Sequence, residues 1–325
     1  MRVIHGLENL GAAVGPVAMT IGNFDGLHLG HQDIIRQVVS LAGSQGLVPT
    51  VLTFEYHPLR LLAPDRAPGL LMPMEQKLER LEELGPKLVV IARCTHELLD
   101  LEPRAFVRDV LLRHFQVRYI VEGPNFRFGH DRAGSIDLLV AMQREYGFEA
   151  VKREPIRVDL PGRGGVMLSS SLVRRLLQEG SVDLAARCLG RPYELIGEVV
   201  SGDGRGRALG FPTANLQTPQ LLPASGVYAA RARIDGVDHQ AAVHLGPAPT
   251  FEHSHHGPEV YVLDFDGDLY GRRLGVKLIR RIRGTERFAD AAALVERMRR
   301  DVREVRSVLA ECNSSRKENT DDHGA

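Results

Sequence analysis

The order of strand-like and helical segments changes near residue 190, and this change constrains the fold more than any other feature of the chain. Before about residue 155, short β-rich apolar runs alternate with amphipathic helical stretches. After Pro192, glycine-punctuated strands follow one another with no helix between them. Alternating strands and helices pair in parallel, whereas strands joined directly pair antiparallel. The sequence therefore predicts two domains of different fold class.

The first domain is predicted to be an α/β, Rossmann-like unit with a doubly wound parallel sheet. Its expected strands are Val17 to Ile21, Val48 to Phe54, Lys87 to Ala92, Val117 to Val121 and Phe148 to Arg153. Its expected helices are Gln32 to Ala42, Met74 to Leu84 and Pro103 to Phe115. In such a sheet, ligands bind at the carboxyl ends of the strands.

The second domain is predicted to be a small antiparallel β-barrel closed by a C-terminal helix. Its expected strands are Glu194 to Ser201, Gly226 to Ile234, Val237 to His244, Glu259 to Phe265 and Arg273 to Arg283. The helix is expected from about Ala289 to Leu309, before a polar tail, 313–325, that is predicted to be disordered. The predicted domains are thus 1–188 and 189–312.

The composition indicates a soluble globular protein that acts on small molecules. Hydrophobic residues make up 43% of the chain and charged residues 25%, and no apolar run is long enough to cross a bilayer. The first ten residues lack the apolar core of a signal peptide, and the three widely spaced cysteines suit reduced thiols, so we expect a cytoplasmic protein. The formal net charge is zero, so overall electrostatic attraction does not favour binding to nucleic acid or to an anionic membrane.

A glycine-rich turn after the first expected strand predicts a nucleotide site. It leads from Gly22 and Phe24 to His28-Leu29-Gly30-His31 and into a helix, whose N-terminus favours a phosphate. The two imidazoles can donate hydrogen bonds to phosphate oxygens, and Gly30 permits close approach of the backbone. Taken alone, a His-x-x-His pair also fits surface residues or a chance metal pair. The strand, turn and helix order instead favours in-line transfer of a nucleotidyl group.

A second helix start can also hold a phosphate. Ser169, Ser170 and Ser171 are suitable N-cap residues, and Arg174 would add a forked cationic donor. An ordinary capped helix with a solvated arginine is the alternative for this segment.

A loop from Gly202 to Asn215 predicts a triphosphate site in the second domain. Its glycines permit backbone N–H groups to wrap phosphates. It is neither a Walker loop nor a dinucleotide fingerprint, and a glycine-rich linker is the alternative. Thr213 and Asn215 are spaced to face one direction on an extended segment, so together they can coordinate Mg²⁺ bound to ATP.

Two further clusters were weighed and given no catalytic role. His253, His255 and His256 can suit a metal, but a polar loop between strands is the favoured interpretation. Arg280, Arg281 and Arg283 are interpreted as a solvated basic face rather than a ligand contact.

The motifs resemble those of the HxGH nucleotidyltransferase superfamily and, within it, the bacterial bifunctional riboflavin kinase/FAD synthetases. The resemblance rests in the first half on 21–31, Thr53 to Pro58, Gly123 to Gly129 and Ser169 to Arg174. In the second half it rests on Pro212 to Asn215, Gly226 to Ala229, His244 to Phe251, Glu259 to Phe265 and Leu269 to Gly271. It implies an enzyme that phosphorylates riboflavin with ATP in the barrel and then adenylylates FMN in the α/β domain, forming FAD and pyrophosphate.

The resemblance also implies a role for each site residue. It makes His28, His31 and Glu259 catalytic, with Glu259 as the base of the kinase, and assigns Asn125 to the flavin and Thr213 and Asn215 to the metal. It assigns the nucleotides to Gly22, Phe24, Gly30, Ser170, Arg174, Gly202, Arg207, Gly210 and Pro212. The implied ligands are riboflavin, FMN, FAD, ATP and Mg²⁺, with FMN as an intermediate and no nucleic acid, membrane or protein partner.

Four positions depart from the family pattern: Tyr56, Ser171, His244 and Tyr261. Neither Tyr56 nor Ser171 removes a charge or a catalytic donor, whereas His244 and Tyr261 bear on the kinase. Two other functions stay open from the sequence. One is a nucleotidyltransferase for another phosphorylated substrate, such as phosphopantetheine; the other is a flavin-binding regulator that has lost its chemistry.

Overall fold

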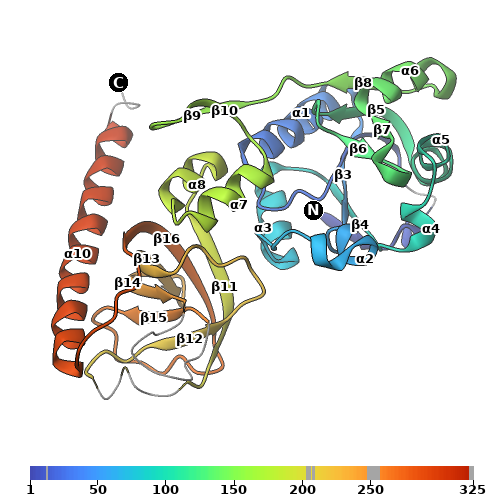
Figure 1. Ribbon diagram of the computed structural model, residues 1–325. Coiled ribbons are helices and arrows are strands. Elements are labelled where there is room, and N and C mark those ends of the chain that lie inside the picture. Colours follow the sequence, from blue (N-terminus) through green and yellow to red (C-terminus); the bar gives the residue numbers. More distant parts are fainter. Residues whose placement is uncertain (12–13, 203–205, 207–208, 247–256, 322–325) are drawn as a thin grey trace. The chain divides into compact units, whose positions relative to one another are not determined.

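The computed structural model describes residues 1–325 except 12–13, 203–205, 207–208, 247–256 and 322–325, and forms two compact units, Met1–Ser170 and Ser171–Ala325 (Figure 1). Arg207 and the histidines His253, His255 and His256 therefore lie outside the described residues.

A six-stranded sheet forms the first unit, with all of its strands parallel in the order β1-β4-β3-β2-β5-β8. The strands are β1 (Arg2–His5), β2 (Pro16–Ile21), β3 (Val48–Phe54), β4 (Leu88–Ala92), β5 (Gln116–Glu122) and β8 (Glu149–Lys152). The predicted α/β class is confirmed, and the five expected strands are present. Edge strand β1 was not predicted, because Val3 and Ile4 alone make too short an apolar run.

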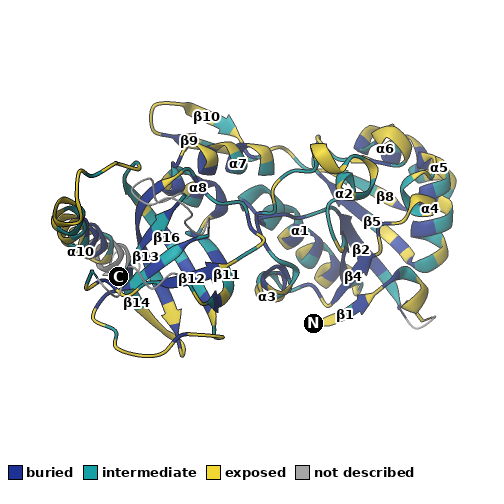
Figure 2. Ribbon diagram, turned by 60° about the horizontal axis from the view of Figure 1, so that its bottom comes forward, coloured by how far each residue is buried: buried dark blue, intermediate teal, exposed yellow. Residues whose placement is uncertain are grey.

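Helices cover both faces of this sheet because its strands carry apolar side chains in both directions. On one face, Ile35 of α1 (Leu29–Gln45) and Leu81 of α3 (Met74–Leu84) pack with Val51, Val89 and Ile91. On the other face, residues of the segment 103–112 and of α6 (Ile136–Tyr146) pack with β2, β3 and β4. The central strands β2, β3 and β4 are buried between the two helical layers (Figure 2).

Shorter elements complete the first unit. The expected helix 103–115 is α5 (Pro103–Ala105) followed by a π-helical segment, Phe106–Leu112. The remaining elements are α2 (Leu59–Leu62), α4 (His96–Leu99), two small antiparallel pairs, β6 (Arg127–Phe128) with β7 (Gly134–Ser135) and β9 (Arg157–Leu160) with β10 (Gly164–Met167), and 3-10 turns at Leu7–Asn9, Pro64–Arg66 and His130–Arg132.

The second unit is a closed antiparallel barrel with strand order β11-β12-β15-β14-β13-β16. The strands are β11 (Tyr193–Val200), β12 (Ala214–Gln217), β13 (Gly226–Ile234), β14 (Val237–Leu245), β15 (Glu259–Val262) and β16 (Arg273–Arg283). The predicted barrel is confirmed. Strand β12 was not predicted, because it is four residues long and follows a glycine-rich loop. Helices α7 (Ser170–Gln178) and α8 (Val182–Leu189) precede the barrel in the chain.

Helix α10 (Ala291–Asp321) lies against the outside of the barrel (Figure 1). Its residues Val305, Val308 and Leu309 pack with Ala229 and Leu263. The helix continues into the segment 313–325 that the sequence analysis predicts to be disordered. The chain holds no glycine or proline between Gly284 and Gly324, so nothing in this stretch of sequence terminates a helix earlier.

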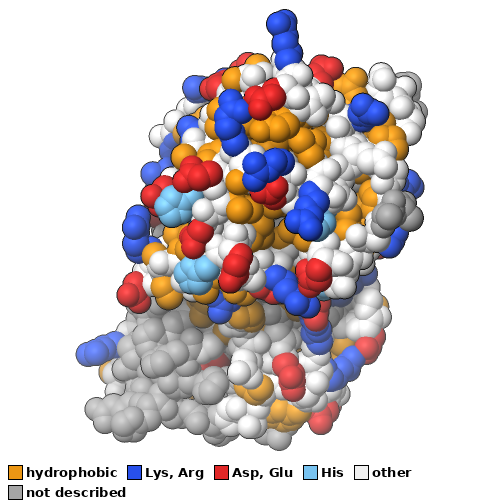
Figure 3. Space-filling view, turned by 90° about the vertical axis from the view of Figure 1, so that its right-hand side faces the viewer, with side chains coloured by type: hydrophobic (Ala, Val, Ile, Leu, Met, Phe, Trp, Pro, Cys, Tyr) orange, Lys and Arg blue, Asp and Glu red, His pale blue; other side chains and the backbone are white. Residues whose placement is uncertain are grey.

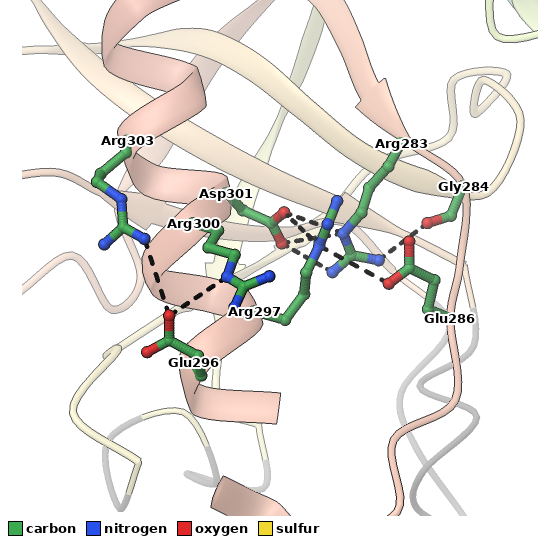
Figure 4. A network of polar contacts seen from close by, with 8 residues as sticks. All are labelled: Arg283, Gly284, Glu286, Glu296, Arg297, Arg300, Asp301 and Arg303. Atoms are coloured by element: carbon green, nitrogen blue, oxygen red, sulfur yellow. Dashed lines mark hydrogen bonds and ion pairs between the residues drawn. The ribbon is translucent and has the colours of Figure 1, made fainter. Parts of the chain in front are cut away.

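An ion cluster fastens α10 to strand β16 (Figure 4). Asp301, which is 4% exposed, accepts hydrogen bonds from Nε and Nη2 of Arg283, the latter at 2.7 Å. Nε of Arg297 lies 3.1 Å from the same carboxylate. The interpretation of Arg283 as part of a solvated basic face is therefore wrong: its side chain is 11% exposed and joins β16 to α10 through Asp301.

Side chains of both charges occur on the face of the molecule that Figure 3 shows. On the face shown in Figure 3, basic and acidic side chains are interspersed, in keeping with the formal net charge of zero. Among the helices that the structure describes, none combines the length and apolar character of a membrane span.

Candidate active sites

The turn after β2 brings several of the predicted nucleotide residues together. Phe24, Gly26 and Leu27 have positive φ angles of 47°, 79° and 42°. Where a residue of this kind adjoins one of right-handed conformation, successive backbone N–H groups can converge and form a concavity that binds anions. The Phe24 ring folds over Gly22, where an added Cβ atom would lie 3.2 Å from the ring. A side chain at residue 22 would therefore displace the aromatic ring that shapes the turn.

His28 and His31 stack at the start of α1, their ring centroids 3.6 Å apart. His28 is the N-cap residue, and its Nδ1 accepts a hydrogen bond from the His31 backbone N–H at 3.3 Å. In a neutral His28 ring, the proton then resides on Nε2. An added Cβ at Gly30 would lie 3.2 Å from the His28 ring, so glycine leaves space for the stack. The pair thus forms part of a helix N-terminus suited to phosphate.

Glu122, which the sequence analysis did not single out, supports the end of β2. It is 3% exposed, and its Oε1 accepts hydrogen bonds from the Ile21 backbone N–H at 2.6 Å and from Thr20 Oγ1 at 3.0 Å. Burial raises the pKa of this carboxyl to about 8. The carboxyl fixes the position of β2 beside β5 at the point where the chain enters the turn.

Replacing Glu122 should remove a pH dependence of stability. Between the ordinary glutamate pKa of 4.5 and about 8, the folded protein holds a proton that the unfolded chain releases, so stability falls as pH rises through this window. We expect Glu122→Gln, which keeps an acceptor for Ile21, to flatten that fall. Calorimetric unfolding of both proteins from pH 5 to 8.5 measures it, and equal slopes would contradict the assignment.

Lys77, also missed from the sequence, lies behind the same turn. This α3 residue is 6% exposed, and its Nζ donates to the Asn23 carbonyl at 2.7 Å. Nearby, the Asp25 carboxylate accepts hydrogen bonds from the backbone N–H groups of Leu71 and Met72, each at 3.1 Å. The signal in the sequence was a lysine on the otherwise apolar stripe of α3.

The other predicted residues of this half lie around the turn or apart from it. Ser170 begins α7, and its Oγ donates to the Asp25 carbonyl at 2.8 Å. Arg174 lies one helical turn further along α7, in the second unit. Asn125 is exposed in the loop between β5 and β6, with its Nδ2 3.8 Å from Met167 Sδ. Ser170 thus joins the turn, while no contact of Asn125 with the histidine pair is seen.

In the barrel, the glycine-rich loop closes directly on the two predicted metal ligands. An added Cβ at Gly202 would collide with Nδ2 of Asn215, and one at Gly206 would lie 3.0 Å from Oγ1 of Thr213. Gly210 has a φ of 83°, and Pro212 is exposed. These contacts explain why glycine is needed at two points of the loop.

Asn215, Glu259 and His244 stand opposite one another on adjacent strands β12, β15 and β14. Ala242 lies two residues from His244 and Tyr261 two residues from Glu259, and both pack against α10. Because side chains alternate along a strand, Asn215, Glu259 and His244 lie on the same outer face of the barrel. The Glu259 side chain is 29% exposed, and its Oε2 lies 3.8 Å from His244 Nδ1. A carboxylate thus stands next to a buried amide, Asn215, beneath the glycine-rich loop.

His244 has a pKa below the ordinary value for histidine. Burial is the main cause, and the nearby Arg283 acts in the same direction, whereas Asp301 opposes them. The imidazole is therefore neutral at pH 7 and adds no positive charge beside Glu259. The other departure from the family pattern, Tyr261, packs edge to face with Phe211 at 5.4 Å and ties the loop to β15.

Two family models match the chain in succession. The FAD synthetase model matches residues 12–161, and the riboflavin kinase model matches residues 189–309. The first match contains the histidine pair, and the second contains Asn215 and Glu259. The folds and sites define a transferase with two distinct ATP-dependent centres in one chain.

Curated relatives match over nearly the full length. A bifunctional riboflavin kinase/FMN adenylyltransferase of Escherichia coli K12 is 36% identical over 304 residues, 93% of this chain and 96% of the relative. The enzyme of the same description from Bacillus subtilis is 33% identical over 303 residues, 88% of this chain and 90% of the relative. The chain belongs to the family of bifunctional riboflavin kinase/FMN adenylyltransferases.

A solved structure supports the fold. The crystal structure described as a macrolide-efflux protein from Streptococcus pneumoniae superimposes with a TM-score of 0.81 at 26% identity, covering 94% of this chain and 99% of that one. The described activity of that protein differs from those of the curated relatives.

Proposed function

We propose that each unit carries one of the two reactions of the family: the barrel phosphorylates riboflavin to FMN, and the α/β unit adenylylates FMN to FAD. The observation that carries this division is the cross-strand pairing of Asn215 with Glu259 beneath a glycine-rich loop in one unit. The first unit, with its stacked histidines at the start of α1, has the features of an adenylyl-transfer site. We accordingly assign the adenylyltransferase to residues 1–188 and the kinase to residues 189–312, a boundary that counts α7 and α8 with the adenylyltransferase although residues 171–188 cluster with the second unit.

In the kinase step, Glu259 acts as the general base. The 5′-hydroxyl oxygen of the ribityl chain attacks the γ-phosphorus of ATP, the bond from that phosphorus to the β,γ-bridging oxygen breaks, and ADP leaves. The hydroxyl proton passes to the Glu259 carboxylate. Because His244 is neutral, it does not stabilise the negative charge of this carboxylate and so does not make Glu259 a weaker base. This supports the role of Glu259 as the general base.

Mg²⁺ fits the side chains present in the barrel. Thr213 and Asn215 offer a hydroxyl and an amide oxygen, the hard ligands that Mg²⁺ takes, and glycine at residues 202 and 206 lets the loop backbone approach both side chains closely. A bound Mg²⁺ would neutralise phosphate charge as ADP leaves. Thr213 and Asn215 would hold the ion, while Gly202, Gly210 and Pro212 would shape the loop around the triphosphate.

In the adenylyl-transfer step, the histidine pair and the turn after β2 hold ATP. A phosphate oxygen of FMN attacks the α-phosphorus, the bond to the α,β-bridging oxygen breaks, and pyrophosphate leaves. His28 and His31 donate hydrogen bonds to phosphate oxygens as charge develops, and the N-terminus of α1 adds its dipole. Ser170 and Arg174 serve the nucleotide, and Asn125 serves the flavin. Because both reactions consume ATP and supply flavin cofactors, we place them in the cytoplasm.

One assay tests the proposal. The protein is incubated with riboflavin, ATP and Mg²⁺, and the products are separated by chromatography over time. We expect FMN to accumulate before FAD, and both to be lost with EDTA. Adenylylation of phosphopantetheine without FAD formation, or flavin binding without ATP consumption, would contradict it.

A further inference from the structure

Lys77 places a positive charge inside the first unit, where an apolar side chain would complete the helix stripe. Its stripe neighbours on α3, such as Leu81, pack in the core of the sheet face. Burial lowers the pKa of Lys77 to about 8, while Asp25 and Cys94 partly oppose that shift. The ammonium is therefore still mostly protonated at pH 7. Retaining it there costs desolvation that a methionine at the same position would avoid.

The hydrogen bond of Lys77 orients one peptide of the turn. Its Nζ donates to the Asn23 carbonyl at 2.7 Å, and Thr53 Oγ1 donates to the same oxygen at 3.4 Å. In a trans peptide the N–H points opposite to the carbonyl, so the N–H of Phe24 points away from Lys77. Among the residues that the structure describes, that N–H has no protein acceptor.

We propose that Lys77 is a positioning residue for adenylyl transfer. Lys77 fixes the Asn23–Phe24 peptide so that the Phe24 N–H faces the triphosphate, and it places a buried positive charge behind the turn. The proposal rests on the assignment of the adenylyl-transfer site to the turn that carries His28 and His31. A buried charge acts on a bound anion through a lower dielectric than water, so its effect falls mainly on ATP.

The test compares Lys77→Met with Thr53→Val in the full chain. Both remove a donor to the Asn23 carbonyl, but Lys77→Met alone removes a charge. We expect Lys77→Met to raise the KM for ATP in FAD formation roughly ten- to a hundredfold, the range of a charge-assisted hydrogen bond, and to leave the KM for FMN unchanged. Thr53→Val should raise the KM for ATP less than about threefold, as befits a long neutral bond. Exposed Lys87→Met is the matched control and should have no effect.

The wild-type protein supplies a second measurement that needs no variant. The titratable groups facing Lys77 are Asp25, from the turn after β2, and Cys94, after β4; burial raises the pKa of the Cys94 thiol to about 11, so it stays neutral below pH 9.5. The KM for ATP in FAD formation should therefore rise between pH 8 and 9.5 as Lys77 loses its proton, while Lys77→Met shows no such rise.

Three outcomes overturn the inference: a flat wild-type profile, equal effects of Lys77→Met and Thr53→Val, or equal losses for ATP and FMN. In all three cases the wild-type protein would still form FAD. Failure of the proposed function would instead appear as no FAD from the wild-type protein.

Discussion

Glu259→Gln is expected to lower the rate of FMN formation by about 10²- to 10⁴-fold, the range for loss of a general base. Glutamine keeps the size of the side chain and its place opposite Asn215 and His244, but it accepts no proton. The KM for ATP should change little, because the glycine-rich loop is untouched. FMN formation from riboflavin is followed by chromatography with saturating ATP.

Supplied FMN provides the control for this variant. Conversion of FMN to FAD takes place in the other unit in our proposal and should proceed at the wild-type rate. Glu198→Gln, at an exposed position on barrel strand β11, should leave both activities unchanged. Equal impairment of both reactions in folded Glu259→Gln would refute the division between the units.

His28→Ala is expected to lower FAD formation from FMN by about 10²- to 10³-fold, as for loss of one donor that stabilises transition-state charge. The substitution also removes the N-cap of α1, which costs about 1 kcal/mol of stability. FMN formation from riboflavin should stay near the wild-type rate. Initial rates of pyrophosphate release with FMN and ATP measure the effect.

His28→Asn separates the two roles of this residue. Asparagine is a good N-cap and should restore the stability of α1, but it lacks the imidazole that stacks on His31. We expect His28→Asn to regain the stability and not the activity. If it regained the FAD synthetase activity as well, His28 would be a capping residue and not a catalytic one.

The sequence predicted long periodic elements well and short ones poorly. Met74 to Leu84 was predicted with both bounds as observed, because an apolar stripe ends at Gly85, which adopts the left-handed conformation. The first helix begins at Leu29 and not at Gln32, since His28 caps it through its side chain, a role that histidine rarely has. Strands β1 and β12, of four residues each, are held by their neighbours rather than by their own patterns.

The residues of the candidate sites also differ in how well the sequence predicted them. The turn that carries the histidine pair is local in sequence, so its residues could be named before the structure was known. The pairing of Glu259 with Asn215 and His244 depends on barrel closure, and Glu259 was named through family resemblance alone. Lys77 and Glu122 were missed because the role of a buried ionisable group can be inferred only when its tertiary partner is known.

The closed barrel has a consequence for how activity is lost. The proposed kinase residues are spread over strands β12, β15 and β14, with Arg283 of β16 as the link to the last helix. Because the strands form a ring, none of them can detach without opening two ladders at once. Heat or proteases should therefore leave molecules with either full phosphorylating capacity or none, and the surviving rate counts the intact molecules.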